Sequence, residues 1–238
     1  MAGFNSAPTL ADLAKYAVNR PGQAEVVRQS LYDFLLYPEA GINQLVFFST
    51  PAGQGVSSAP GAVVGSQKTQ ADTNMTNAGL LPAPQQFLIQ SIELKFYPGS
   101  SVAANTFVPA KMDQFNAVAA ASLNKSADDV MAFSSSGWLQ LFIGSKAYLQ
   151  EAPLGRFPPK TNLSLQSAVA NNSATTSEVE VMNAVLSGRP YMLDPPLALV
   201  NNQNFQVSLN WPGAVALPSG FNGRIGVVLD GWLYRNSQ

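Results

Sequence analysis

A strict alternation of apolar and polar residues near the C-terminus constrains this chain most. From Phe205 to Trp211 every second residue is apolar, and each residue between them is polar. Successive side chains of a β-strand point to opposite faces, so this alternation predicts a strand with one buried face. Ile225, Val227 and Leu229 are predicted to form a last strand before the C-terminus. The end of the chain therefore indicates a sheet protein.

Further strand candidates run from residue 45 onward, separated by Gly, Pro and Asn turns. In the segment 87–97, Ile92, Leu94 and Phe96 share one face, whereas Glu93 and Lys95 share the other, which we expect to face solvent. About eight or nine strands joined by tight turns and long loops favour an antiparallel sandwich with Greek-key connections. The other candidates are residues 45–48, 138–149, 162–170, 178–186, 191–200, 205–211 and 225–234.

The first part of the chain has helical spacing instead. Thr9 is a candidate N-cap, Pro21 and Gly22 interrupt the pattern, and residues 27, 31, 34 and 35 are apolar on one helical stripe. We therefore predict a helical arm over residues 1–41, with helices within 9–36, and one β domain over residues 42–238. Residues 51–84 are predicted to form a long loop, and residues 109–133 are compatible with a short helix or a crossover loop.

The chain is poor in charge. Charged residues make up 11% of it, against about 25% in ordinary soluble proteins, and its 13 basic and 14 acidic residues leave a net charge of −1. Near-zero net charge favours association, so we predict a subunit that buries much of its surface against neighbours. An ordinary secreted β-protein is the alternative. The basic residues form no block, which argues against a nucleic-acid groove.

No targeting or membrane segment is expected either. The start, MAGFNSAP, lacks the basic and apolar regions of a signal peptide. No apolar run approaches the roughly 18 residues of a membrane span. We therefore expect the protein to be made, and to remain soluble or assembled, in a cytoplasm.

The chain contains no His and no Cys. This excludes Ser-His-Asp and Cys-His catalysis, disulfides, and zinc sites that use imidazole or thiolate. Residues 51–55 hold two glycines but lack the lysine of a phosphate-binding loop, so they are predicted to form a flexible turn.

A pair of carboxylates is the catalytic option that remains. Glu178 and Glu180 share one face of a predicted strand, about 7 Å apart. Nothing else in the sequence favours catalysis there, and we predict that the protein is not an enzyme and has no catalytic residues. The carboxylates considered are Glu93, Asp113, Asp128, Asp129, Glu151, Glu178, Glu180, Asp194 and Asp230.

A calcium site built from Asp128, Asp129 or Asp194 would use oxygen ligands alone, but no EF-hand spacing is present. We predict no metal and no cofactor. Asp128 and Asp129 are expected in a loop or at a helix start, and Asp194 is expected to cap N–H groups at a strand end.

The tryptophans offer a possible sugar-binding platform. Each lies at the edge of an apolar strand, so packing in the core or at an interface is the favoured interpretation. The three residues are Trp138, Trp211 and Trp232.

Several segments resemble structural proteins of bacterial viruses. They are residues 44–48, 51–55, 72–75, 80–84, 87–90, 191–196 and 226–231. A helical arm followed by a β series is also similar to jelly-roll capsid proteins of icosahedral viruses. The likeness spans most of the chain. It implies two four-stranded sheets packed face to face, with many copies tiling a closed shell. A compact double jelly roll is the alternative, but it needs about sixteen strands, twice the eight of one roll.

The resemblance implies a virion protein that self-assembles in the host cytoplasm, most simply the major capsid protein of an icosahedral phage. Its partners would be copies of itself, as a trimer or a larger shell, and other virion proteins, with no specific nucleic-acid sequence. The arm would contact an internal membrane or the genome, although Lys15, Arg20 and Arg28 are too few for strong genome binding. The alternatives are a capsid-decorating or head-fibre protein of a tailed phage, a lectin-like module, and a hydrolase using Glu178 or Glu180.

Overall fold

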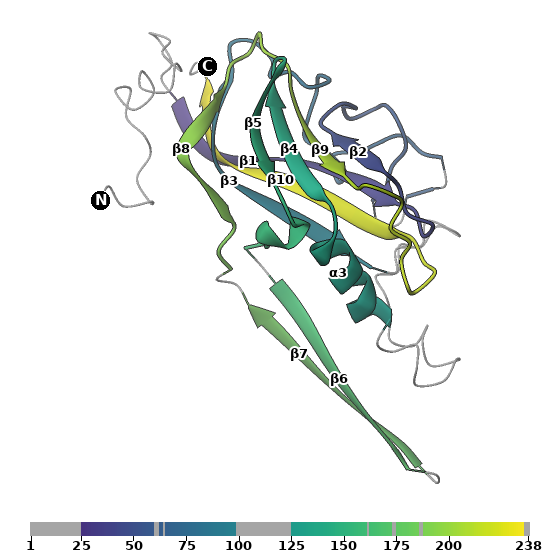
Figure 1. Cartoon of the computed structure of the whole chain (residues 1–238). Coiled ribbons are helices and arrows are strands. Elements are labelled where there is room, and N and C mark those ends of the chain that lie inside the picture. The colour runs from purple at the N-terminus through teal and green to yellow at the C-terminus, as the bar shows by residue number, and fades with distance from the viewer. Residues whose placement is uncertain are drawn as a thin grey trace.

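Two four-stranded antiparallel sheets pack against each other in this mainly β protein (Figure 1). The computed structural model describes residues 25–59, 62–63, 65–98, 125–160, 162–172, 175–185 and 188–235. In order across the first sheet, the strands are β1 (Glu25–Tyr37), β10 (Gly223–Arg235), β3 (Gln86–Tyr97) and β8 (Tyr191–Leu199). Across the second sheet they are β2 (Gln44–Phe47), β9 (Phe205–Asn210), β4 (Trp138–Ile143) and β5 (Lys146–Glu151).

The strands of the sandwich pair as a nested set. The first pairs with the last (β1 with β10), the second with the last but one (β2 with β9), then β3 with β8, and finally β4 with β5. Two further pairings, β10 with β3 and β9 with β4, complete the sheets. The first four strands of the sandwich therefore pair in reverse order with the last four, and the resulting ladder of pairs folds into two sheets around the core.

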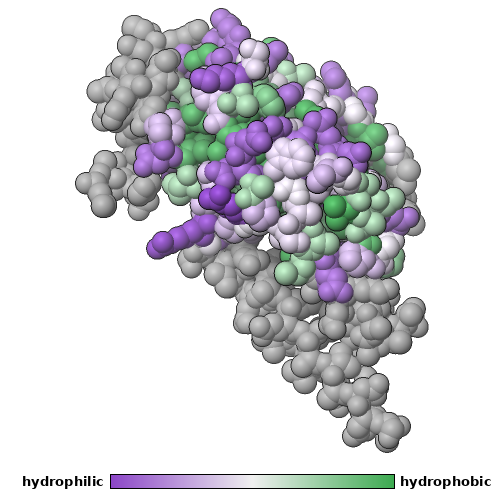
Figure 2. Space-filling model, viewed as in Figure 1, coloured by the Kyte–Doolittle hydropathy of each residue, from purple (hydrophilic) through white to green (hydrophobic). Residues whose placement is uncertain are grey.

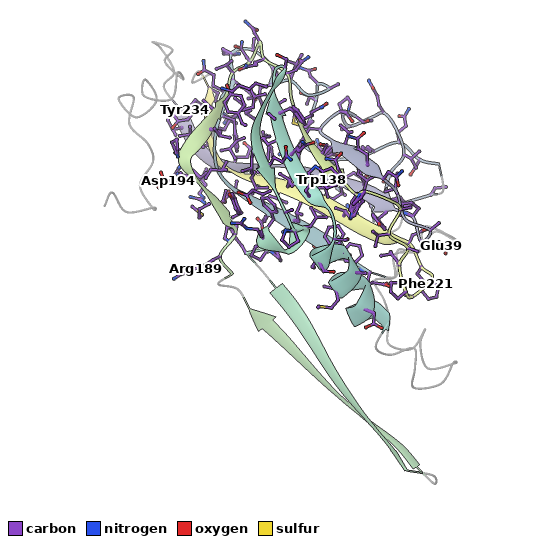
Figure 3. All side chains as sticks on the ribbon, in the orientation of Figure 1. Glu39, Trp138, Arg189, Asp194, Phe221 and Tyr234 are labelled. Atoms are coloured by element: carbon purple, nitrogen blue, oxygen red, sulfur yellow. The ribbon has the colours of Figure 1, made fainter. Side chains whose placement is uncertain are left out.

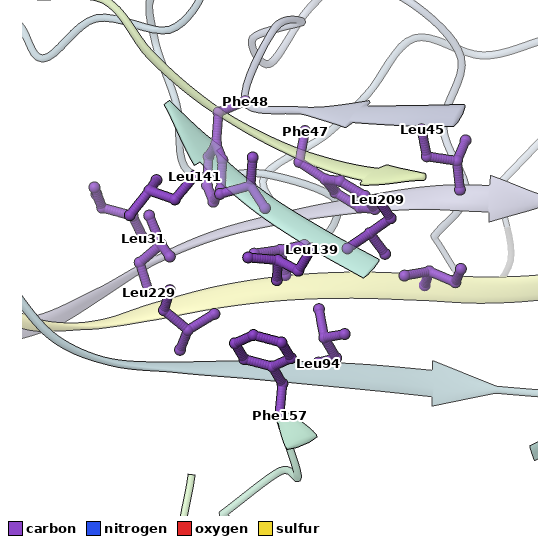
Figure 4. Packing of buried hydrophobic residues seen from close by; sticks show 14 of the residues in the cluster. Leu31, Leu45, Phe47, Phe48, Leu94, Leu139, Leu141, Phe157, Leu209 and Leu229 are labelled. Atoms are coloured by element: carbon purple, nitrogen blue, oxygen red, sulfur yellow. The ribbon is translucent and has the colours of Figure 1, made fainter. Parts of the chain in front are cut away.

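The core lies between the two sheets, as the alternation predicted. In β4 every second residue is buried, and Leu139 and Leu141 join Leu209 of the neighbouring strand β9 in the core of the sandwich (Figure 4). One end is closed by α3 (Lys125–Ser135), whose Phe133 stacks on Phe96 with ring centroids 4.6 Å apart. A short 3₁₀ turn (Leu154–Arg156) follows β5.

The second of the two helices predicted within residues 9–36, the one after Pro21 and Gly22, is wrong where the structure describes it. Residues 25–37 form β1, which pairs with β10 along its whole length. Val27, Leu31 and Leu35 are spaced by four residues, and that spacing puts them on one face of a strand as well as near one face of a helix. Pairing with β10 decides between the two. This part of the predicted arm belongs to the sandwich, and residues 9–24 lie outside the described residues.

Other expectations are confirmed with changes of boundary. The predicted strand over residues 138–149 is two strands, β4 and β5, joined by a tight turn in which Gly144 has a φ of 62°. The predicted loop between residues 51 and 84 contains no strand in its described part. Helix α3 occupies the end of the ambiguous segment 109–133, of which residues 109–124 lie outside the described residues.

Two long strands stand apart from the sandwich. β6 (Asn162–Asn172) and β7 (Thr175–Val185) pair only with each other in the described part of the chain and project away beyond α3 (Figure 1). These are the predicted strands 162–170 and 178–186. No helix within the described residues has both the length and the apolar character that a membrane crossing needs.

A β-bulge in β3 brings two backbones close together. Asp230 of β10 pairs with Ser91, whereas the next residue, Gly231, pairs with Ile89, so Gln90 is the extra residue. A side chain at Gly231 would overlap the backbone carbonyl of Leu88. Glycine at this position therefore allows the close approach of β10 to β3.

Replacing Gly231 with alanine should destabilise the fold. Overpacking of this kind costs about 1–3 kcal/mol, and here the obstructing atom belongs to the backbone. Urea denaturation measures the loss. Gly213→Ala is the matched control, because an added methyl at this exposed glycine meets no atom within 4 Å. Equal stability of the two variants would contradict the close-approach argument.

Candidate functional site

Four charged side chains are buried together beneath the long loop, and we call them the buried charge cluster. Asp33 comes from β1, Lys68 and Asp72 from the loop, and Arg224 from the start of β10. Both carboxylates have no exposed surface, Lys68 is 3% exposed and Arg224 is 6% exposed. Charges at this depth are tolerated only when they are paired and hydrogen-bonded.

Asp33 and Lys68 form an ion pair at the centre of the cluster. Lys68 Nζ lies 2.6 Å from Asp33 Oδ1, and the backbone N–H of Phe48 donates to Asp33 Oδ2 at 2.7 Å. Phe48 has a φ of 67°, a conformation that bulky residues rarely adopt. Burial raises the pKa of Asp33, and the neighbouring Lys68 opposes this effect. Asp33 therefore holds two segments in place: the loop, through Lys68, and the strained backbone at Phe48 just after β2, through its N–H.

Asp72 anchors the loop to itself and to β10. Its carboxylate accepts hydrogen bonds from Ser57 and from the backbone N–H groups of Ser58 and Thr69, while Arg224 Nη2 lies 3.5 Å from Oδ1. Burial by itself would raise the pKa of Asp72, but these hydrogen bonds outweigh it and hold the pKa below its ordinary value.

The anchored loop lies along the outer edge of β1. The N–H of Phe34 donates to the carbonyl of Asp72 at 2.8 Å, and Thr73 forms a bridge with Asp33. The guanidinium of Arg224 packs over the ring of Phe34, 4.1 Å from its centroid. The cluster therefore holds a stretch of loop in place as a cover for this sheet edge.

A second polar feature is a pocket of about 330 Å³ on the face of the first sheet opposite the main core. Arg28 Nη2 lies 2.6 Å from Asp230 Oδ2, and Lys160 pairs with the same carboxylate oxygen. Burial lowers the pKa of Lys160, and the nearby charge of Arg28 lowers it further. The lining residues are Arg28, Gln90, Ser91, Lys160, Pro190, Met192 and Trp232.

The environments predicted for two carboxylates, those of Glu93 and Asp194, are wrong. Glu93 was expected in solvent but is 4% exposed, and its Oε2 accepts a hydrogen bond from the N–H of Lys160 at 2.7 Å. The cause is that the segment around Phe157 runs beside β3, where the Phe157 carbonyl accepts from Leu94. Asp194 was expected to cap a strand end, yet it lies exposed within β8, where the β3–β8 ladder is interrupted (Figure 3).

The other acidic residues do not converge. Asp128 lies in the first turn of α3 and Asp129 follows it, so of the two expectations, a loop or a helix start, the structure shows the helix start; Asp129 accepts from the N–H of Ser219 at 2.8 Å. Glu151 binds Tyr191 and Arg156. The backbone of β7 puts residues 178 and 180 on one face, as expected, and Asp113 lies outside the described residues. Within the described ranges no three acidic residues gather as a metal site would require.

The packing interpretation of the tryptophans is confirmed for two of them. Trp211 is 3% exposed in the main core, and its Nε1 donates to Ser136 at 3.2 Å. Trp232 is 7% exposed and packs with Leu88 and Tyr234 on the opposite face of the first sheet. Trp138 is half-buried at the start of β4. The two buried rings serve different clusters, so they do not form one platform.

Sequence reasoning missed the buried charge cluster. Asp33 was the one available signal, because it is the only charged residue in the apolar stretch from Leu31 to Leu36. Lys68 and Asp72 lie in a polar loop, where a charged residue gives no indication of burial.

Comparisons with known proteins add little. No family model matches the chain, and no curated protein matches it. A chain in a solved structure of Triatoma virus is 12% identical, with 100% of this chain and 74% of that chain covered and a TM-score of 0.14. At that TM-score the likeness carries no argument about fold or function.

Breaking the buried ion pair should be costly. Lys68→Met leaves the carboxylate of Asp33 buried without its partner, a change that typically costs about 3–5 kcal/mol. Urea denaturation should show this loss and a partial recovery in the double variant Asp33→Asn/Lys68→Met. Arg156→Met, which breaks a pair whose arginine side chain is 51% exposed, should cost less than about 1 kcal/mol. A Lys68→Met variant as mildly affected as Arg156→Met would refute the structural role of the pair.

Asp72 should make stability depend on pH. Its folded pKa lies below the ordinary value of 3.8, so its contribution is complete above about pH 4 and is lost as the pH falls through the folded pKa. Asp33, whose pKa is raised, acts in the opposite direction. The unfolding free energy of the wild type should therefore exceed that of Asp72→Asn most near neutral pH.

The measurement is urea denaturation of both proteins across a pH series. The difference between them should shrink as the pH falls below about 4. Asp194→Asn, which removes an exposed carboxylate of β8, is the matched control. A difference between wild type and Asp72→Asn that stays constant with pH would exclude this role.

Proposed function

We propose that this protein is a jelly-roll subunit that self-assembles into the shell of a virion, most simply as the major capsid protein of an icosahedral bacteriophage. The nested strand order carries the proposal. Eight strands that pair first with last, second with last but one, and so on, in two four-stranded sheets, fit the jelly roll of viral capsid and lectin domains and of cupins.

Charge favours a shell among the proteins that use this fold. The net charge is −1 and charged residues make up 11% of the chain. Apolar side chains also reach the surface in several places, scattered among polar ones on the face that Figure 2 shows. A surface with so little charge is suited to burial against neighbouring copies. The large apolar residues most exposed are Val56, Val63, Tyr97, Val130, Met131, Tyr148, Met192 and Phe221.

The proposal includes a non-enzymatic role, a location in the virion and assembly in the host cytoplasm. Its partners are copies of the chain and other virion proteins, with no specific nucleic-acid sequence. A capsid-decorating or head-fibre protein is the second candidate, because the projecting β6–β7 hairpin is suited to reaching a neighbour outside the sandwich. A lectin-like role has less support, since Trp211 and Trp232 are buried.

Light scattering and negative-stain microscopy of the purified full-length chain test the proposal. We expect closed particles of uniform size, whereas a decorating protein should give a stable trimer that forms no shell. A protein that stays monomeric at high concentration would overturn both candidates. Glycan-array binding that is lost in Trp138→Ala would move the assignment to the lectin-like module.

A further inference from the structure

Three of the four outer strands of the sandwich are protected against pairing with another chain. The edge of β1 is covered by the loop, where Asp72 accepts from Phe34 and Asn74 donates to Tyr32. The edge strand β8 contains Pro195 and Pro196, which have no N–H to donate. The edge strand β2 is only four residues long. Short strands, prolines and covering loops are the usual means of blocking an exposed edge.

β5 is the exception. It pairs with β4 on one side and with no other strand in the described part of the chain. Its residues Lys146, Ala147 and Tyr148 are all exposed, and Tyr148 retains 44% of its surface. This edge therefore offers its backbone N–H and carbonyl groups to an added strand.

The β6–β7 hairpin lacks a third strand along either edge in the described part of the chain. Its two strands pair with each other in unbroken register over eleven residues, and Figure 1 shows them leaving the sandwich on a course away from β5. A two-stranded hairpin alone in water is marginally stable at best. Stability would come from a further strand along one of its edges, and its direction puts the β5 edge of its own copy out of reach.

Charge points to the same pairing. Between residues 162 and 185 the charged residues are Glu178 and Glu180, both in β7 and on one face of it. The exposed charge of β5 is Lys146, because its other charged residue, Glu151, already binds Arg156 and Tyr191. Opposite charges on neighbouring strands stabilise a sheet, and like charges destabilise it.

We propose that the β7 edge of one copy adds to the β5 edge of a second copy and so extends that copy's second sheet. The contact rests on the proposed function, since it supposes that copies of the chain assemble. Backbone hydrogen bonds would supply the affinity of such strand addition, and the charge pairing would select the strand.

Cross-linking of single-cysteine variants tests the contact. Because the chain has no cysteine, each introduced thiol is unique. Ala147→Cys in β5 is mixed with Ser177→Cys in β7 and treated with a short bis-maleimide linker. We expect a covalent heterodimer on a denaturing gel. In the control mixture Ala214→Cys, an exposed alanine outside the strands, replaces Ala147→Cys. Equal cross-linking in both mixtures, or none in either, would overturn the proposal.

A charge exchange gives the second measurement. Lys146→Glu should raise the protein concentration at which particles appear in light scattering, and adding Glu178→Lys and Glu180→Lys to the same chain should lower it again. Lys125→Glu, a charge reversal in α3, is the matched control and should leave assembly unchanged. Wild-type particles together with Lys146→Glu particles at the same protein concentration would reject the β5–β7 contact and leave the shell function standing. A monomeric wild type would reject the shell function itself.

Discussion

β10 is the strand on which the rest of the structure depends. It pairs with β1 on one side and with β3 on the other, and all but its last residue are buried. One face supplies Ile225, Val227 and Leu229 to the main core, while Trp232 and Tyr234 belong to the smaller cluster on the opposite face. Antiparallel pairing of the last strand with the first closes the sandwich. The fold is therefore complete only when both ends of the β series meet.

Burying a whole strand also buries its charges, and the chain uses them as anchors. Arg224, near one end of β10, is tied to Asp72 of the loop, and Asp230, further along, is tied to Arg28 of β1 and to Lys160. Removing one member of such a set would leave an unpaired charge in the interior. With these acidic residues and the Asp33–Lys68 pair inside, the exterior carries even less charge than the composition implies. The surface is therefore poorer in charged residues than the chain as a whole.

The sequence predicted strands well where only one face of the strand packs on the core, because such strands alternate apolar and polar residues. It predicted them poorly where contacts with distant segments determine the secondary structure. β4 and β9 alternate because each has one face on the core. β1 was predicted as helix because its apolar spacing of four fits both periods, and only its pairing with β10 distinguishes them. The burial of Glu93 and Lys68 depends on segments far away in the chain, which no local pattern records. Strand order cannot be predicted from local patterns for the same reason, because the sequence of a strand does not show which other strand pairs with each of its two edges.

A protein with a net charge of only −1 has little repulsion to keep its copies apart, so the geometry of its edges must decide how they meet. In this sandwich the loop over β1, the prolines of β8 and the shortness of β2 each close one direction of sheet growth. If all four edges were open, copies would stack in several ways, and such contacts lead to disordered aggregates. In the described part of the sandwich β5 is the edge left open, and the proposed contact pairs it with the β7 edge of another copy, so that each copy would accept one neighbour and reach another. A heterologous contact of this kind would form a ring if the rotation between copies closes, which is consistent with the proposed shell.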